Sequence, residues 1–200
     1  MAAIFLPAPE VELRQRFFAE EESAAFFAAL RVTIAWRQDA MRIAGKSINL
    51  PRLTAWYGDP GTEHTYSGIR NVPEPWTSEL ASIKARVQAA AQAPFNAVLL
   101  NLYRGSGDSM GWHSDDEHDM SPTIASVSLG AARTFQFRRK APPADTVSMR
   151  LTDGSLLIMA GGTQRHWQHR VPKAPAAGER INLTFRYVEC AAVSVGAGDE

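Results

Sequence analysis

The stretch that decides the fold of this 200-residue chain reads Arg180-Ile181-Asn182-Leu183-Thr184-Phe185-Arg186. Polar and apolar residues alternate in it, which is the period-two pattern of a β-strand. Ile181, Leu183 and Phe185, with Tyr187 beyond them, form an ordinary core face. The opposite face carries two arginines, an asparagine and a threonine, and buried arginines without partners are costly. We therefore expect this face to meet either solvent or a bound anion.

Further strands are predicted between residue 96 and this stretch. Apolar or alternating runs predict them at Asn96–Tyr103, Ile124–Leu129, Thr134–Phe137, Val147–Thr152 and Ser155–Met159. The last two runs are joined by Asp153-Gly154, so we expect them to form a strand-turn-strand unit. Many short strands with no helices between them favour a sandwich or a barrel closed on itself.

Two helices are predicted in the N-terminal half. Glu20–Leu30 is rich in Glu, Ala and Phe, which are mostly good helix formers or core fillers. Ser78–Ala91 has apolar residues at helical spacing, with Thr77 or Ser78 as its cap and Pro94 to end it. The apolar face of this second helix consists of Leu80, Ile83 and Val87.

Composition excludes some classes of protein. The 21 basic residues balance the 21 acidic ones, so the total shows no strongly basic surface, although a local patch is compatible with it. A single cysteine, Cys190, excludes an intrachain disulfide and fits a reducing compartment. No apolar run approaches the roughly 18 residues that span a bilayer, and Met1–Pro9 does not read as a signal peptide. We expect a soluble, cytoplasmic protein without a membrane partner.

A candidate metal site consists of His113, Asp115 and His169. Residues two positions apart point to one face of an extended segment, whereas His169 lies 54 positions after Asp115 (169 minus 115) and must come from another strand. Two histidines and one carboxylate hold Fe(II) and leave other coordination positions open, as in non-haem iron oxygenases. Zinc accepts the same ligands, and a solvated polar loop is the alternative without a metal.

Arg180 and Arg186 suit an anionic co-substrate. A guanidinium fork binds a carboxylate through two parallel hydrogen bonds, each contributing roughly 1.5–3 kcal/mol. Asn101 and Tyr103 form a similar polar pair at period two on another strand. The alternative is that both strands turn these side chains to solvent.

Together these segments resemble the AlkB-type Fe(II)/2-oxoglutarate dioxygenases, which are nucleic-acid alkylation-repair demethylases, and look closest to the branch that repairs duplex DNA. The resemblance extends from about Arg42 to Val188. The matching segments are Asn101–Tyr103, His113–Glu117, Ile124–Ala131, Gly154–Met159, His166–His169 and Arg180–Arg186.

The resemblance implies a mainly β fold with flanking helices, namely a double-stranded β-helix (jelly roll) under an N-terminal nucleotide-recognition lid. Within one compact domain, it places the helices and lid in residues 1–95, the dioxygenase core in 96–190 and a flexible tail in 191–200. It implies that iron is bound by His113, Asp115 and His169. It implies that 2-oxoglutarate is bound by Asn101, Tyr103, Arg180, Thr184 and Arg186, with Asn182 as an addition. It implies that the damaged base is contacted by His64, Tyr66, Asp116 and Glu117.

The implied activity is oxidative demethylation of N1-methyladenine and N3-methylcytosine in DNA. Fe(II), 2-oxoglutarate and O2 supply the oxidising power, the methyl group is hydroxylated, and formaldehyde leaves. Methylation at these positions makes the base cationic, and carboxylates such as Asp116 and Glu117 favour a cation. Because the methyl group lies on the pairing edge, the base must be flipped out or single-stranded.

Two positions depart from the family pattern. The hairpin loop Ile43-Ala44-Gly45-Lys46 has alanine where the closest relatives carry an aromatic wedge that fills the gap left by a flipped base. We therefore expect a weaker preference for duplex over single-stranded DNA. His64 stands where a phenol or indole is expected, which leaves the base preference open.

The expected partner of this protein, taken as a monomer, is DNA in single- or double-stranded form. Phosphate contacts are predicted for Lys46, Arg52, Arg133, Arg138, Arg139 and Lys140. Three alternatives stay open: the same chemistry on RNA or tRNA bases, a catalytically decayed nucleic-acid-binding module, and a zinc hydrolase. The zinc hydrolase leaves Arg180 and Arg186 without a role.

Overall fold

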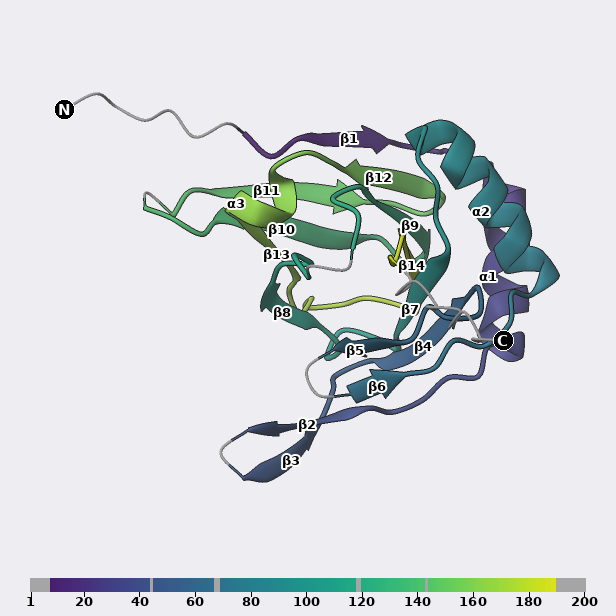
Figure 1. The fold of residues 1–200 in the computed structure, drawn as a ribbon, viewed down its shortest axis with the longest axis horizontal. Helices are drawn as coiled ribbons and strands as arrows, with labels where there is room; N and C mark the ends of the chain where they lie inside the picture. Colours follow the sequence, from purple (N-terminus) through teal and green to yellow (C-terminus); the bar gives the residue numbers. More distant parts are fainter. Residues whose placement is uncertain (1–7, 44, 67–68, 118–119, 143, 190–200) are drawn as a thin grey trace, which may run out of the picture.

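Two antiparallel β-sheets pack face to face, and two helices cover the outside of the larger sheet (Figure 1). The computed structural model describes residues 8–43, 45–66, 69–117, 120–142 and 144–189, without the side chains of 42–43, 64–66 and 69–70. Ala44 and the predicted tail 191–200 lie outside the described residues. The two-layered architecture confirms the predicted mainly β, jelly-roll fold.

The larger sheet has six strands in the order β1-β12-β9-β14-β7-β4. They are β1 (Val11–Arg14), β4 (Leu53–Gly58), β7 (Ala97–Tyr103), β9 (Ile124–Gly130), β12 (Ser155–Met159) and β14 (Arg180–Arg186). β14 lies between β7 and β9, and all of its residues are buried. β1 and β4 come from the N-terminal half. The larger sheet therefore contains strands from both of the expected parts of the chain, residues 1–95 and 96–190.

The smaller sheet has four strands in the order β11-β10-β13-β8. They are β8 (Met110–His113), β10 (Arg133–Arg139), β11 (Thr146–Leu151) and β13 (Trp167–Val171). An apolar cluster joins the two sheets and includes Tyr103 and Ile124 of the larger sheet with Phe135, Phe137 and Val171 of the smaller one. β8 is an edge strand of the smaller sheet, and its last residue is the first predicted iron ligand.

The predicted strand-turn-strand unit over residues 147–159 is wrong in its pairing. β11 pairs with β10, whereas β12 pairs with β1 and β9, so the chain crosses from one sheet to the other at this turn. Gly154 has a φ of +65°, and Asp153 Oδ1 accepts hydrogen bonds from Ser23 Oγ at 2.5 Å and Gly130 N at 2.7 Å. These contacts tie the turn to α1 and β9. Alternation along a strand predicts its faces but not its partners.

Both predicted helices are confirmed as α1 (Glu20–Thr33) and α2 (Ser78–Ala91). Thr77 caps α2 by accepting a hydrogen bond from Leu80 N at 3.2 Å. Leu80, Ile83 and Val87 are fully buried and belong to one cluster with the apolar residues of β14. The helices therefore close one face of the larger sheet and leave its other face to the smaller sheet.

Shorter elements complete the described part of the chain. They are β2 (Ala40–Ile43), β3 (Lys46–Asn49), β5 (His64–Tyr66), β6 (Ile69–Asn71) and α3 (Thr163–His166). β2 and β3 pair as the hairpin predicted around Gly45, whose φ is +79°. In Figure 1 this hairpin projects below the sheets. Among the described residues, no helix has the length and apolar character of a membrane span.

Candidate active site

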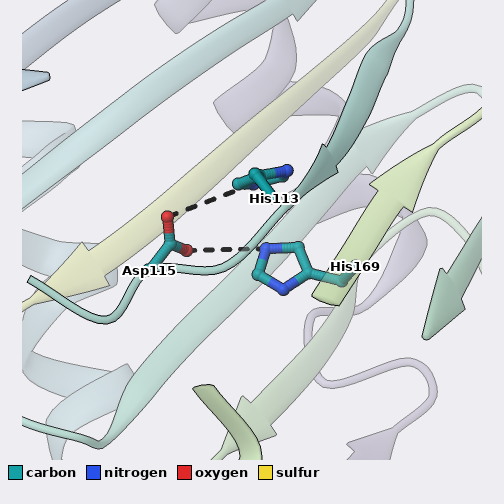
Figure 2. Close-up of side chains that lie close together, drawn as sticks. All are labelled: His113, Asp115 and His169. Atoms are coloured by element: carbon teal, nitrogen blue, oxygen red, sulfur yellow. Dashed lines mark ion pairs between the residues drawn. The ribbon is translucent and has the colours of Figure 1, made fainter. Parts of the chain in front are cut away.

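The predicted iron ligands His113, Asp115 and His169 lie together (Figure 2). His113 ends β8 and is the direct register partner of His169 on β13. Asp115 lies two residues beyond β8, with its Oδ2 at 3.5 Å from His169 Nε2 and its Oδ1 at 4.0 Å from His113 Nε2. Their three donor atoms all lie within 4.8 Å of one another. Donors that each bind an ion at about 2.0–2.2 Å need this kind of spacing.

Neighbouring groups orient the imidazole of His113 and the backbone of Asp115, and burial sets the protonation of His113. His113 Nδ1 lies 2.9 Å from Gly111 O, which leaves Nε2 for a metal. Burial, followed by the neighbouring His169, lowers the pKa of His113 to about 4, so its imidazole is neutral at neutral pH. The backbone N–H of Asp115 donates to Gln164 Oε1 at 3.1 Å. Gln164 was not predicted from the sequence, because nothing in the sequence ties it to a carboxylate 49 positions earlier.

Arg186 neutralises the carboxylate of the metal site. Its Nη2 lies 2.8 Å from Asp115 Oδ1, and the two side chains are only 3% and 2% exposed. Burial alone would raise the pKa of Asp115, but Arg186 and the two histidines hold it well below its usual value. The site therefore keeps a charged carboxylate beside the neutral imidazole of His113, as a divalent metal requires.

The predicted metal and 2-oxoglutarate residues line one cavity of about 30 Å³ between the sheets. They are Asn101, Tyr103, His113, Asp115, His169, Arg180, Thr184 and Arg186. The exposed fraction of the polar residues on β14 is 1–8%, which contradicts the alternative that this strand faces solvent.

Arg180 has unused hydrogen-bonding capacity in this cavity. Its Nη2 donates to Ser128 Oγ at 2.9 Å, but its buried Nε and Nη1 have no partner. Burial lowers the pKa of Arg180, and the charge and side-chain hydrogen bond of Tyr103, whose ring centre lies 5.2 Å from the guanidinium, oppose this shift. A buried charged donor without a partner costs free energy. Charged N–H groups that are free to donate suit a carboxylate, so these residues fit 2-oxoglutarate.

Asn101 and Asn182 are held by neighbouring polar groups. Asn101 Oδ1 accepts from Arg52 Nε at 2.8 Å. Asn182 Nδ2 donates to Ser126 Oγ at 2.7 Å, while its Oδ1 accepts from the Thr184 hydroxyl at 3.0 Å. Asn182 is thus placed to orient Thr184.

Two predicted phosphate contacts are wrong because the side chains are buried. Arg52 is 5% exposed and lies against Asn101. Arg133 is 1% exposed, and its guanidinium donates to backbone carbonyls that include Asp108 O at 2.8 Å and Pro172 O at 2.6 Å. Neither guanidinium is therefore available to a nucleic acid. The prediction failed because sequence alone does not distinguish a buried arginine from an exposed one.

The predicted substrate residues are described only in part. Asp116 forms an ion pair with Lys140 at 2.7 Å, and the hydrogen bond from Lys140 lowers its pKa. Burial raises the pKa of Glu117, whose Oε2 lies 4.0 Å from Arg186 Nη1. The backbone of His64 and Tyr66 forms β5, but their side chains lie outside the described residues. Stacking on the base therefore stays a prediction.

Comparison with known proteins identifies the family. A model described as the 2OG-Fe(II) oxygenase superfamily matches residues 10–186. Human alpha-ketoglutarate-dependent dioxygenase alkB homolog 3 is 44% identical over 167 residues, or 78% of this chain and 58% of that protein. Mouse DNA oxidative demethylase ALKBH2 is 36% identical over 184 residues, or 86% of this chain and 77% of that protein. The solved structure of OsALKBH1 shares the fold, with a TM-score of 0.67 and 20% identity over 90% of this chain and 99% of that one.

The chain belongs to the 2OG-Fe(II) oxygenase superfamily. Its His113, Asp115 and His169 are placed to bind the Fe(II) of that superfamily, whose co-substrate is 2-oxoglutarate. Similarity to AlkB homologues confirms the resemblance seen in the sequence. The chain spans 50–62% of the length of its alkB homolog 3 relatives.

Proposed function

We propose that this protein removes N-linked methyl groups from nucleic-acid bases by oxidation, with N1-methyladenine and N3-methylcytosine in DNA as substrates. The observation that carries the proposal is the cavity in which the His-Asp-His triad meets a buried, partly unpaired Arg180. The relative named DNA oxidative demethylase supports the choice of substrate class. The zinc hydrolase alternative explains the triad but gives Arg180 no ligand.

The metal triad and the two arginines of β14 would have different roles. The triad would hold iron; when bound, Fe(II) and 2-oxoglutarate supply the chemistry that activates O2 and hydroxylates the methyl group. Arg180 would bind the carboxylate of 2-oxoglutarate that does not reach iron, because its Nε and Nη1 are unpaired. Arg186 lies six residues further along the strand, beside Asp115, and keeps the carboxylate of Asp115 ionised. The hydroxylated methyl group then leaves as formaldehyde.

The base would bind beside the acidic pair that follows Asp115. A base methylated on its pairing edge is cationic, and the carboxylates of Asp116 and Glu117 favour it over the neutral product by Coulomb attraction. Lys140 holds Asp116 at 2.7 Å, which limits how far that carboxylate is free to move toward the base. Glu117 is the more buried of the two, so we expect it to discriminate more strongly between cationic and neutral bases.

A mass-spectrometric assay tests the proposal. A single-stranded oligonucleotide with one N1-methyladenine is incubated with protein, Fe(II), 2-oxoglutarate, ascorbate and air, beside a duplex version. His113→Ala removes a metal ligand, whereas His166→Ala removes a histidine of α3 outside the triad. We expect loss of the methyl group with wild type and His166→Ala, none with His113→Ala, and no strong preference for the duplex.

The other outcomes separate the alternatives. Succinate release without loss of the methyl group would show the oxygenase chemistry with a different substrate. Neither succinate nor demethylation from metal-loaded protein would contradict the proposal and favour a decayed or zinc-dependent site. A strong preference for duplex DNA would contradict the expectation drawn from Ala44.

A further inference from the structure

A β-bulge places Trp112 on the outer face of the smaller sheet. On β13, His169 and Val171 line the cavity with one residue between them. Their register partners on β8, His113 and Met110, also line it but have two residues between them. Such an extra residue re-aims a side chain, and bulges are frequent beside active sites. The bulge keeps His113 directed inward while the indole of Trp112 meets outward-facing side chains of two neighbouring strands.

Two arginines are held against this tryptophan. The guanidinium carbon of Arg138 lies 4.5 Å, and that of Arg170 4.4 Å, from the centre of the Trp112 ring. Gln168 accepts a hydrogen bond from Arg138 at 2.8 Å, and Gln136 accepts one from Arg170 at 2.7 Å. These neutral partners orient both guanidinium groups without compensating their charge.

The outer face around them is positive. On β10, β11 and β13 the outward residues are Thr, Gln, Ser and Arg, including Arg150, and none of them is acidic. Among the described residues, no carboxylate lies within 4.0 Å of the guanidinium of Arg138 or Arg170. We call Trp112, Arg138 and Arg170 the tryptophan–arginine patch. An ordered cluster of uncompensated arginines is complementary to phosphate.

The patch is continuous with the active site. Trp112 and His113 both line a second cavity of about 210 Å³, together with Met41 of β2 and the 50–52 segment. β8 is the edge strand, so the path from the metal site to the outer face passes around one strand only. In Figure 1, β8, β13 and β10 lie on the side away from α1 and α2. An extended polyanion that places one unit at the metal site can therefore reach the patch.

We infer that the tryptophan–arginine patch binds phosphates of the single strand that flanks the base in the active site, an inference that rests on the proposed function. Arg138 and Arg170 contact the phosphates, and Trp112 orients the two guanidinium groups. For single strands, each phosphate contact contributes about 0.7 to the slope of log affinity against log salt. Removing either arginine should reduce that slope by this amount and weaken binding several-fold at moderate salt.

Fluorescence anisotropy with a labelled single-stranded oligonucleotide carrying one central N1-methyladenine tests this, with salt varied for each protein. Arg138→Gln and Arg170→Gln should each flatten the slope and lower affinity, and Trp112→Leu should lower affinity more than Trp112→Phe. Arg16→Gln is the matched control, because Arg16 is exposed on the β1–α1 connection outside this sheet. Arg138→Lys keeps the charge and should retain the slope, and thermal melting verifies that each variant is folded.

Fluorescence anisotropy measures binding and not turnover. The proposed patch and the proposed function can therefore be contradicted separately. Wild-type slopes and affinities in folded Arg138→Gln and Arg170→Gln would overturn the patch even if demethylation is normal. An equal loss in Arg16→Gln would also overturn it, since any surface cation would then suffice. Wild-type protein that binds through these arginines but does not demethylate would leave the patch standing and contradict the proposed function.

Discussion

Both faces of β14 are buried, but in different ways. On one face Ile181, Leu183 and Phe185 have no exposed surface and pack against the helices. On the other, Arg180 and Arg186 are 1% and 3% exposed, and Arg180 keeps two nitrogens without a partner. Apolar burial stabilises the fold, whereas incomplete pairing of a buried cation costs stability. One face thus supports folding, whereas the role that we propose for the other is to bind a ligand.

The largest effect on stability is expected where the polar face forms a buried ion pair. Arg186→Gln leaves the charge of Asp115 buried without its cation, so the metal-free protein should lose about 3–5 kcal/mol of unfolding free energy. Urea denaturation measures the loss. A divalent metal at the triad replaces the missing charge and should stabilise the variant more than wild type. Equal metal stabilisation of both proteins would contradict this role for Arg186.

On the apolar face, Leu183→Ala should destabilise the protein by about 2–5 kcal/mol, because it leaves a cavity among fully buried side chains. The same urea denaturation measures this. Iron-dependent succinate release below the melting temperature should stay close to wild type, since Leu183 does not line the metal cavity. A folded Leu183→Ala protein without activity would show that the two faces are not separable.

The polar face should also make stability depend on pH. Between the ordinary histidine pKa near 6.5 and the value of about 4 for His113, the unfolded state binds the proton and the native state does not. Stability of the metal-free protein should therefore fall as the pH is lowered through this window, by up to about 3 kcal/mol. Thermal melting from neutral pH downward measures it. His113→Gln should flatten the profile, and an unchanged profile would contradict the assignment.

The smallest of these effects is expected at Gln164, which holds the backbone of Asp115. Gln164→Leu removes that hydrogen bond and should weaken metal binding about 10–100-fold, as for other groups that orient metal ligands. Titration with Mn(II) measures the affinity. Gln15→Leu, an exposed glutamine outside the site, is the control. Equal affinities for the two variants would remove Gln164 from the site.

Local pattern predicted α1, α2 and most strands of the two main sheets, but it gave no bounds for β1, β8 or β13. The bounds of α2 and β12, the buried face of α2 and the two-faced character of β14 all follow from periodicity. The metal triad followed from ligand chemistry together with the resemblance to the AlkB-type dioxygenases, because the residue types and spacing alone left zinc and a solvated loop open. Tyr187 was placed wrongly on the core face of β14: the strand ends at Arg186, and Tyr187 is 37% exposed.

What the sequence did not predict depends on tertiary contacts. β11 and β12 were assigned to one unit, but they belong to different sheets. Arg52 and Arg133 carry the same charge as surface arginines, and only the fold buries them beneath the site. Gln164 and Trp112 gain their roles from α3 and from a bulge, neither of which a period-two pattern reveals.

The central claim is that Arg180 is held partly unpaired for a carboxylate. Calorimetric titration of 2-oxoglutarate into Mn(II)-loaded wild type and Arg180→Leu, with urea unfolding of both metal-free proteins, tests it most directly. We expect one-to-one binding to wild type, at least about 100-fold weaker binding to the variant, and no loss of unfolding free energy, because the substitution removes a buried charge that is only partly paired. Wild-type affinity in Arg180→Leu, or a loss of stability as large as that of Leu183→Ala, would contradict the claim.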